Sequence, residues 1–258
     1  MFQAHPRSCA DPPACLRENG LVRLAKGQLH EVHAGVDDWA SAMAFGLAAI
    51  EADVRRPIVL LRVRKGKYRN RDRAMQMEPY GPGWTPLGLD PGRLVIVDAA
   101  DGAGLLRAGL DAAREAGPAA VLMESWGRLP EYDLVASRRL ILAAERSRLP
   151  VVMLRGDAEP RASAAHTRWM VSSAPSTPLE MRAPGGPALL VELQRRRGGP
   201  GGMRWRLEWN EEHGGFREEL LDPAQPDVDA GGRPAPPLSG TVVSLAALRT
   251  REPQRRTA

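Results

Sequence analysis

The sequence contains no run of about 18 apolar residues, so it offers no candidate for a membrane-spanning helix. Residues 1–20 carry prolines and charges where a signal peptide would have an apolar core. Only two cysteines are present, Cys9 and Cys15, and no paired histidines stand near them. A zinc site and a framework of disulfides are therefore both unexpected. These absences predict a cytoplasmic protein without membrane contact.

Strand and helix patterns alternate through the first two thirds of the chain. Near-continuous apolar runs, typical of buried parallel strands, occupy residues 57–63, 93–97, 119–124 and 150–154, and a shorter strand is expected at 27–32. Apolar residues recur at helical spacing at 38–52, 102–116 and 133–148. Strand patterns without intervening helices follow at 167–172, 188–194 and 203–209. The predicted fold class is α/β: a mostly parallel sheet flanked by helices and extended by antiparallel C-terminal strands.

The last of these strand patterns has a period of two. Met203, Trp205, Leu207 and Trp209 alternate with Arg204, Arg206 and Glu208, and the glycine-rich segment 198–202 precedes them. We therefore expect a hairpin turn at 198–202, and a strand at 203–209 whose charged side chains face water.

Three segments differ in composition. Residues 1–20 are an irregular lead-in, residues 21–221 form the expected core, and residues 222–258 are a flexible tail rich in Pro, Gly and Asp. Within the tail, residues 241–256 join an apolar patch to arginines, so they are a candidate docking segment. Its candidate contacts are Val242, Val243, Leu245, Leu248, Arg249 and Arg251. The alternative is a tail that binds nothing.

The loop after the first strand lacks what a phosphate site needs. Such loops use glycines so that backbone N–H groups converge on phosphates, a lysine to neutralise charge, and a Ser or Thr to hold Mg²⁺. Residues 33–39 read HAGVDDW, with Gly35 as the one glycine and the carboxylates of Asp37 and Asp38 where phosphates would lie. We expect Asp37 or Asp38 to cap the following helix instead. Glu124 stands where a Mg²⁺-binding acid would close a strand, but a polar residue facing solvent is the favoured interpretation.

Other catalytic patterns are also missing. The five histidines are scattered, no HExxH metal motif occurs, and no GxSxG nucleophile elbow is present. We expect neither a cofactor nor catalysis, with residual ATP hydrolysis as a minor alternative.

Basic residues cluster in two places. The segment 62–73 holds seven basic side chains, one tyrosine and a single opposing carboxylate, and residues 195–197 are three arginines beside the expected hairpin turn. Both segments are candidate contacts for nucleic-acid phosphates or for a partner, with a solvated surface as the alternative. The candidates are Arg62, Arg64, Lys65, Lys67, Tyr68, Arg69, Arg71, Arg73, Arg195, Arg196 and Arg197.

Several short motifs give the chain a family resemblance. They are LHEV at 29–32, YGPG at 80–83, LGLDP at 87–91 with Arg93 and Leu94, ESWG at 124–127, ASRRL at 136–140, TRW at 167–169, RRGG at 196–199 and Trp205 with LEW at 207–209. In this order and spacing they resemble the ImuA family of RecA-like, damage-inducible mutagenesis proteins, which also carries a SulA-like label. Residues 87–125 are similar to the RecA core.

The resemblance implies an accessory or adaptor role in error-prone translesion DNA synthesis during the SOS response. The implied partners are an ImuB-type polymerase subunit, an error-prone C-family DNA polymerase and RecA, with direct DNA contact weak or indirect. The SulA-like label implies the alternative, an inhibitor of cell division. Compared with RecA, the catalytic glutamate after the second strand and the glutamine at position 155 are absent, and the DNA loops at 127–131 and 156–165 are short. ATP-switched DNA binding is therefore not expected.

Overall fold

The computed structural model describes residues 17–18, 21–50, 56–63, 79–85, 90–210 and 215–221, and the fold below is that of these residues. They belong to one compact unit, residues 1–223, and a second unit spans 224–258. The strands are β1 (Arg17–Glu18), β2 (Leu21–Val22), β3 (Leu29–Ala34), β4 (Ile58–Val63), β5 (Leu94–Ala99), β6 (Ala120–Trp126), β7 (Val151–Gly156), β8 (Thr167–Ala174), β9 (Ala188–Arg196), β10 (Met203–Asn210) and β11 (Gly215–Leu221). The α-helices are α1 (Trp39–Ala48), α2 (Gly102–Arg114) and α3 (Leu134–Ser147), with 3-10 turns at Gly81–Gly83, Pro91–Arg93 and Glu180–Arg182.

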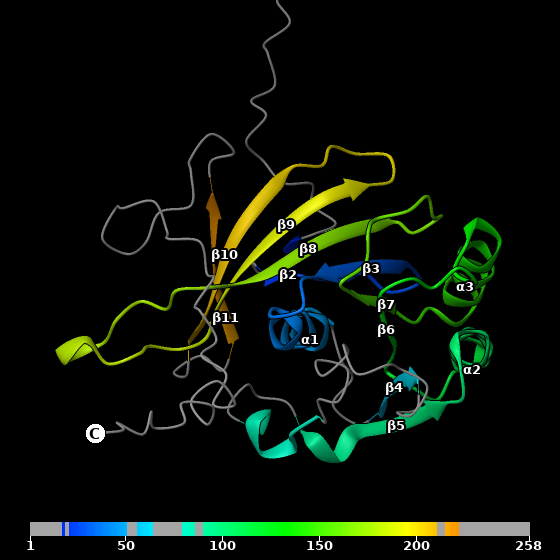
Figure 1. Ribbon diagram of the computed structural model, residues 1–258, viewed down its shortest axis with the longest axis horizontal. Coiled ribbons are helices and arrows are strands. Elements are labelled where there is room, and N and C mark those ends of the chain that lie inside the picture. Colours follow the sequence, from blue (N-terminus) through cyan, green and yellow to red (C-terminus); the bar gives the residue numbers. More distant parts are fainter. Residues whose placement is uncertain are drawn as a thin grey trace, which may run out of the picture. The chain divides into compact units, whose positions relative to one another are not determined.

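A mixed sheet of nine strands forms the centre of the molecule, in the order β11-β10-β9-β8-β3-β7-β6-β4-β5 (Figure 1). All neighbours from β8 to β5 are parallel, whereas the pairs β8–β9, β9–β10 and β10–β11 are antiparallel. The predicted fold class is thereby confirmed. We had expected residues 167–172 among the antiparallel strands, but β8 joins the two parts, because it runs parallel to β3 and antiparallel to β9.

Helices cover both faces of the parallel part. On one face α1 packs with Val32, Leu122 and Leu154, and on the other α2 and α3 pack with Val121 and Met153. Successive strand residues point to opposite faces, so each central strand supplies both cores and is apolar throughout. No helix among the described residues is long and apolar enough to span a membrane.

Aspartates start the two outer helices. The Asp101 carboxylate accepts a hydrogen bond from Gly104 N, and the Asp133 carboxylate accepts one from Ala136 N, each satisfying a backbone donor of the first turn. At the other end of α3, Arg148 adopts a left-handed conformation and stops the helix. In helix α1 the buried residues form one broad face that includes Trp39, Met43 and Phe45, and Ala40 on the other side is exposed.

The hairpin at the antiparallel end matches the expected turn, with β9 and β10 joined through residues 197–202. The expected wet face of β10 is wrong at one position. Glu208 is buried, because Thr177 covers it and donates two hydrogen bonds of 2.7 Å to its carboxylate, one from the backbone N and one from the hydroxyl. The segment between β8 and β9 thus covers Glu208, although the alternating pattern of β10 predicts that this side chain faces solvent.

Candidate functional site

The carboxyl edge of the parallel strands is where ligands bind in open α/β sheets. Strands β3, β4, β6 and β7 end there, at Ala34, Val63, Trp126 and Gly156. The loop after β3 leads directly into α1, which is the position of the expected degenerate phosphate site. This edge is therefore the first place to look for chemistry.

Asp38 stands at the N-cap of α1, as predicted, but its carboxylate does not cap the helix. It accepts hydrogen bonds from the backbone N and the hydroxyl of Ser173, both at 2.7 Å, and so joins the start of α1 to β8. The expectation of a capping carboxylate is wrong because a strand 135 residues away offers two donors. Gly35 and Asp37 lie exposed in the loop. An incoming phosphate would meet the exposed carboxylate of Asp37 at the N-terminus of α1.

Glu124 corrects a second expectation. Strand β6 continues past it to Trp126, and its side chain is 6% exposed rather than facing solvent. Its carboxylate accepts a hydrogen bond from Trp126 Nε1 at 3.1 Å and lies 3.9 Å from Arg62 Nε.

Arg62 is a candidate contact for nucleic acid or a partner in the sequence, but it is 4% exposed and lies in β4, opposite Glu124 in register. Its charge balances a buried carboxylate, so it is not a surface residue that could reach a phosphate.

Two tryptophans close the edge beside this ion pair. The rings of Trp39, the first residue of α1, and Trp126 are 4.8 Å apart between centroids and tilted by 48°. Trp126 also lies against Gly156, where a Cβ atom would be 2.6 Å from the indole ring. A glycine is thus required for the ring to occupy this place. Among the residues that the structure describes, no group of three or more His, Cys, Asp or Glu is arranged to hold a metal ion.

The opposite face of the sheet buries a charged network. Arg168 Nε donates to Glu31 at 2.7 Å, Tyr132 OH donates to the other carboxylate oxygen at 2.8 Å, and His33 Nε2 lies 3.7 Å from Glu31. Burial raises the pKa of Glu31, but the nearby polar side chains of His33 and Ser163 and the Arg168 guanidinium outweigh it, so the pKa falls from 4.5 to about 2. Burial also raises the pKa of Tyr132 well above 10, and the Glu31 charge adds to this. Glu31 is therefore a fixed anion.

Arg155 lies near the end of β7 and makes two hydrogen bonds to residues of β6 and the loop after it. It donates to the Ser125 hydroxyl at 2.8 Å and to the Gly127 carbonyl at 3.0 Å, and its guanidinium lies 5.9 Å from the Tyr132 ring centroid. Burial lowers the pKa of the Arg155 guanidinium below its usual value. These contacts tie β6 to β7, so the arginine acts as a cross-link between strands. The sequence analysis did not predict the network around Glu31 and Arg155. The signal in the sequence was a charged residue inside an otherwise apolar strand, such as Glu31 in β3 and Arg155 in β7.

The arginines at 195–197 lie on the α3 side of the sheet. Arg195 donates to the Ser163 and Ala165 carbonyls, at 3.2 and 2.9 Å, and fastens the segment before β8 to β9. Arg196 ends β9 and is half-buried, and Arg197 follows it and is exposed.

The remaining predicted contacts lie outside the described residues. They are Arg64, Lys65, Lys67, Tyr68, Arg69, Arg71 and Arg73 of the basic segment, and Val242, Val243, Leu245, Leu248, Arg249 and Arg251 of the tail.

Comparisons with known proteins add a likeness of fold. No family model and no curated protein matches the chain. Among solved structures the chain is similar to the crystal structure of the RadB recombinase, with 14% sequence identity and a TM-score of 0.47, over 73% of this chain and 90% of that chain. This likeness concerns the path of the chain and carries no conclusion about activity.

Proposed function

We propose that this chain is a non-catalytic, RecA-like accessory protein of the ImuA type, acting as an adaptor in error-prone translesion DNA synthesis. Its partners in this proposal are an ImuB-type polymerase subunit and an error-prone C-family polymerase. The observation that carries the non-catalytic part is the state of the carboxyl edge, where Asp38 is bound to Ser173 and Trp39 packs on Trp126.

The physical reason is the donor set that phosphates require. A phosphate site presents converging backbone N–H groups and a cation to the anion. Here the loop presents an exposed carboxylate, Asp37, and the nearby cation, Arg62, is buried beside Glu124. A nucleotide at this loop would meet the Asp37 carboxylate and would gain no exposed cation from Arg62.

Residues of the motifs that carry the family resemblance form hydrogen bonds and ion pairs inside this fold. In ESWG, Glu124 pairs with Arg62, Ser125 accepts from Arg155, and the Gly127 carbonyl accepts from Arg155. In TRW, the Thr167 hydroxyl is 2.7 Å from His30 Nδ1 and 2.8 Å from Trp169 Nε1, and Arg168 pairs with Glu31.

The motif residues described above are mostly buried and bonded to one another, so they stabilise the fold and leave partner binding to other residues on the surface. The motifs therefore support an adaptor better than an enzyme.

The decisive test is the frequency of damage-induced mutation in a deletion strain. We expect a fall in the deletion strain and recovery when the wild-type chain is restored. An unchanged frequency, together with filamentous cells on overexpression, would overturn the proposal in favour of an inhibitor of cell division.

A second test addresses nucleotide binding directly. A ligand at one hundred times its Kd stabilises a protein by about 2.7 kcal/mol, which thermal unfolding detects easily. We expect millimolar ATP with Mg²⁺ to leave the melting temperature of the full chain unchanged. A clear upward shift, larger with ATP than with the same concentration of MgCl₂ alone, would support residual nucleotide binding instead.

A further inference from the structure

An open groove of about 520 Å³ runs beside α3, between the helix, the segment before β8 and the end of β9. Its apolar side is made by Leu134, Ile141 and Leu142 of α3. Leu134 is 41% exposed and Leu142 is 53% exposed. Large aliphatic side chains left this open beside a hollow are typical of a binding surface.

Arginines line the same groove. Arg138 lies on α3, one turn from both Leu134 and Leu142, and Arg197 follows β9; both are exposed, and Arg196 is half-buried. Arg195 also lines the groove, held in place by the Ser163 and Ala165 carbonyls. Four arginines thus face a single carboxylate, Glu145.

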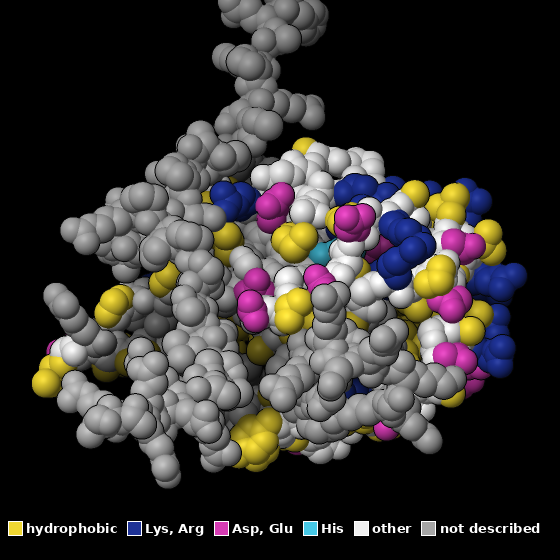
Figure 2. Space-filling view, in the orientation of Figure 1, with side chains coloured by type: hydrophobic (Ala, Val, Ile, Leu, Met, Phe, Trp, Pro, Cys, Tyr) yellow, Lys and Arg dark blue, Asp and Glu magenta, His cyan; other side chains and the backbone are white. Residues whose placement is uncertain are grey.

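Figure 2 shows basic, acidic and apolar side chains intermixed on the side of the molecule where α2 and α3 lie, so the excess of arginines belongs to the groove itself.

We propose that this groove, defined by Leu134, Leu142, Arg138 and Arg197, binds an amphipathic acidic segment of a partner protein. Aliphatic side chains of the segment would cover the exposed leucines, and its carboxylates would pair with the arginines. Complementary charge of this kind fixes the register of a partner and speeds its association. The inference stands on the groove alone, whichever complex the partner belongs to.

Charge excludes the chain's own tail as the occupant. Residues 241–258 contain four arginines and one glutamate, so they carry the same sign as the groove. Nucleic acid is disfavoured for a different reason, since phosphate contacts need cations but gain nothing from exposed leucines. A partner that is both acidic and apolar is the one that satisfies both halves of the groove.

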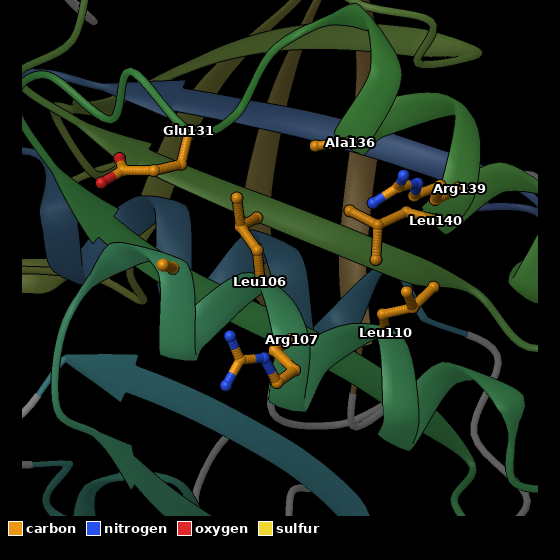
Figure 3. A pocket seen from close by; sticks show the side chains of 8 residues that line it. Leu106, Arg107, Leu110, Glu131, Ala136, Arg139 and Leu140 are labelled. Carbon is orange, nitrogen blue, oxygen red and sulfur yellow. The ribbon is translucent and has the colours of Figure 1, made fainter.

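A second groove lies between α2 and α3 and serves as a comparison for the first (Figure 3). It is smaller, at about 290 Å³, and the side chains of Leu106, Leu110 and Leu140 reach into it. Its charged side chains are Arg107, Arg139 and Glu131, so its charge is nearly balanced. This groove lacks the one-sided charge on which the proposal rests, and its arginines supply the matched control.

The test begins with a library of random 16-residue peptides displayed on phage and selected on the full chain. Counter-selection uses the variant Arg138→Glu/Arg197→Glu. Enriched peptides are then synthesised with a fluorescent label, and their affinity is measured by anisotropy. We expect enriched peptides to combine Asp or Glu with aliphatic residues, and the double variant to bind them at least about tenfold more weakly. Leu142→Ser should also weaken binding.

Two controls separate the groove from general effects. Arg107→Glu/Arg139→Glu changes net charge by the same amount, and Val135→Ser removes another exposed aliphatic side chain of α3, 55% exposed. Both should bind the peptides within about twofold of wild type. All substituted side chains are exposed, and circular dichroism confirms that each variant is folded.

Three results would overturn the proposal. One is that no peptide family depends on the groove, and another is that the enriched peptides lack carboxylates. The third is that labelled single-stranded DNA, and no peptide, loses affinity in Arg138→Glu/Arg197→Glu. None of these bears on the mutation-frequency test, so failure of the groove and failure of the proposed function are distinguishable.

Discussion

The buried pair of Glu31 and Arg168 allows a quantitative prediction. The two side chains are 2.7 Å apart, and the carboxyl group is 2% exposed. Substituting Glu31→Gln keeps the size of the side chain and an oxygen for the Tyr132 hydroxyl, so the change removes the charge with little loss of packing. Arg168 is then left beside a neutral amide in a buried setting.

The magnitude follows from the lowered pKa. A fall from 4.5 to about 2 means that folding favours the ionised Glu31 by about 3 kcal/mol, at 1.36 kcal/mol per pKa unit. Because the folded pKa is depressed, this stability is fully present above pH 4.5 and is lost as the pH falls through the folded value, near 2. Glu31→Gln should therefore cost about 3 kcal/mol at pH 7, within the range measured for broken buried pairs.

Urea unfolding of the wild type, Glu31→Gln, Arg168→Met and the double variant measures the effect at pH 7, 5, 4 and 3. We expect a coupling energy of about 2 kcal/mol at pH 7. The difference between the wild type and Glu31→Gln should be constant from pH 7 to 5 and should shrink towards pH 3. A difference that stays constant down to pH 3, or a coupling energy near zero at pH 7, would refute the argument.

Two further substitutions test the carboxyl edge. Gly156→Ala should destabilise the fold by about 1–3 kcal/mol in urea unfolding, because the new Cβ would lie 2.6 Å from the Trp126 ring; Gly117→Ala, with nothing within 4 Å, should change stability by less than about 0.5 kcal/mol. Arg62→Met should lower the free energy of unfolding by about 3 kcal/mol, because it leaves the buried Glu124 carboxylate without that cation. If stability is unchanged and DNA binding in a filter assay is weaker, Arg62 is a surface contact after all.

Long periodic segments of the sequence predict the core elements well. Residues 102–116 were expected as a helix and α2 spans Gly102–Arg114, because apolar residues at helical spacing face one side of the sheet. Strand β11 was missed, since Gly215–Leu221 contains three charged residues and alternates poorly. It is a strand because β10 offers it a free edge, which is a property of the assembled sheet and not of the segment.

The candidate site was harder to predict for a related reason. The sequence shows that the loop at 33–39 has a single glycine and no lysine, but it does not show that Asp38 finds its donors on β8. Likewise, Arg62 and Glu124 form a pair because β4 and β6 are neighbours in a particular register. Register depends on the whole sheet, so a basic segment that includes a buried arginine looks uniformly exposed in sequence.

The distribution of burial separates framework from function in this molecule. At the carboxyl edge and beneath α3, two pairs of charged groups are buried: Glu124 with Arg62, and Glu31 with Arg168. Removing either partner would cost stability, so these residues are explained by the fold. The exposed side chains beside α3 have no such explanation, because an aliphatic side chain such as Leu142, 53% exposed, gains little in the isolated chain. Its position beside Arg138 and Arg197 is explained if the proposed acidic, amphipathic partner segment covers it.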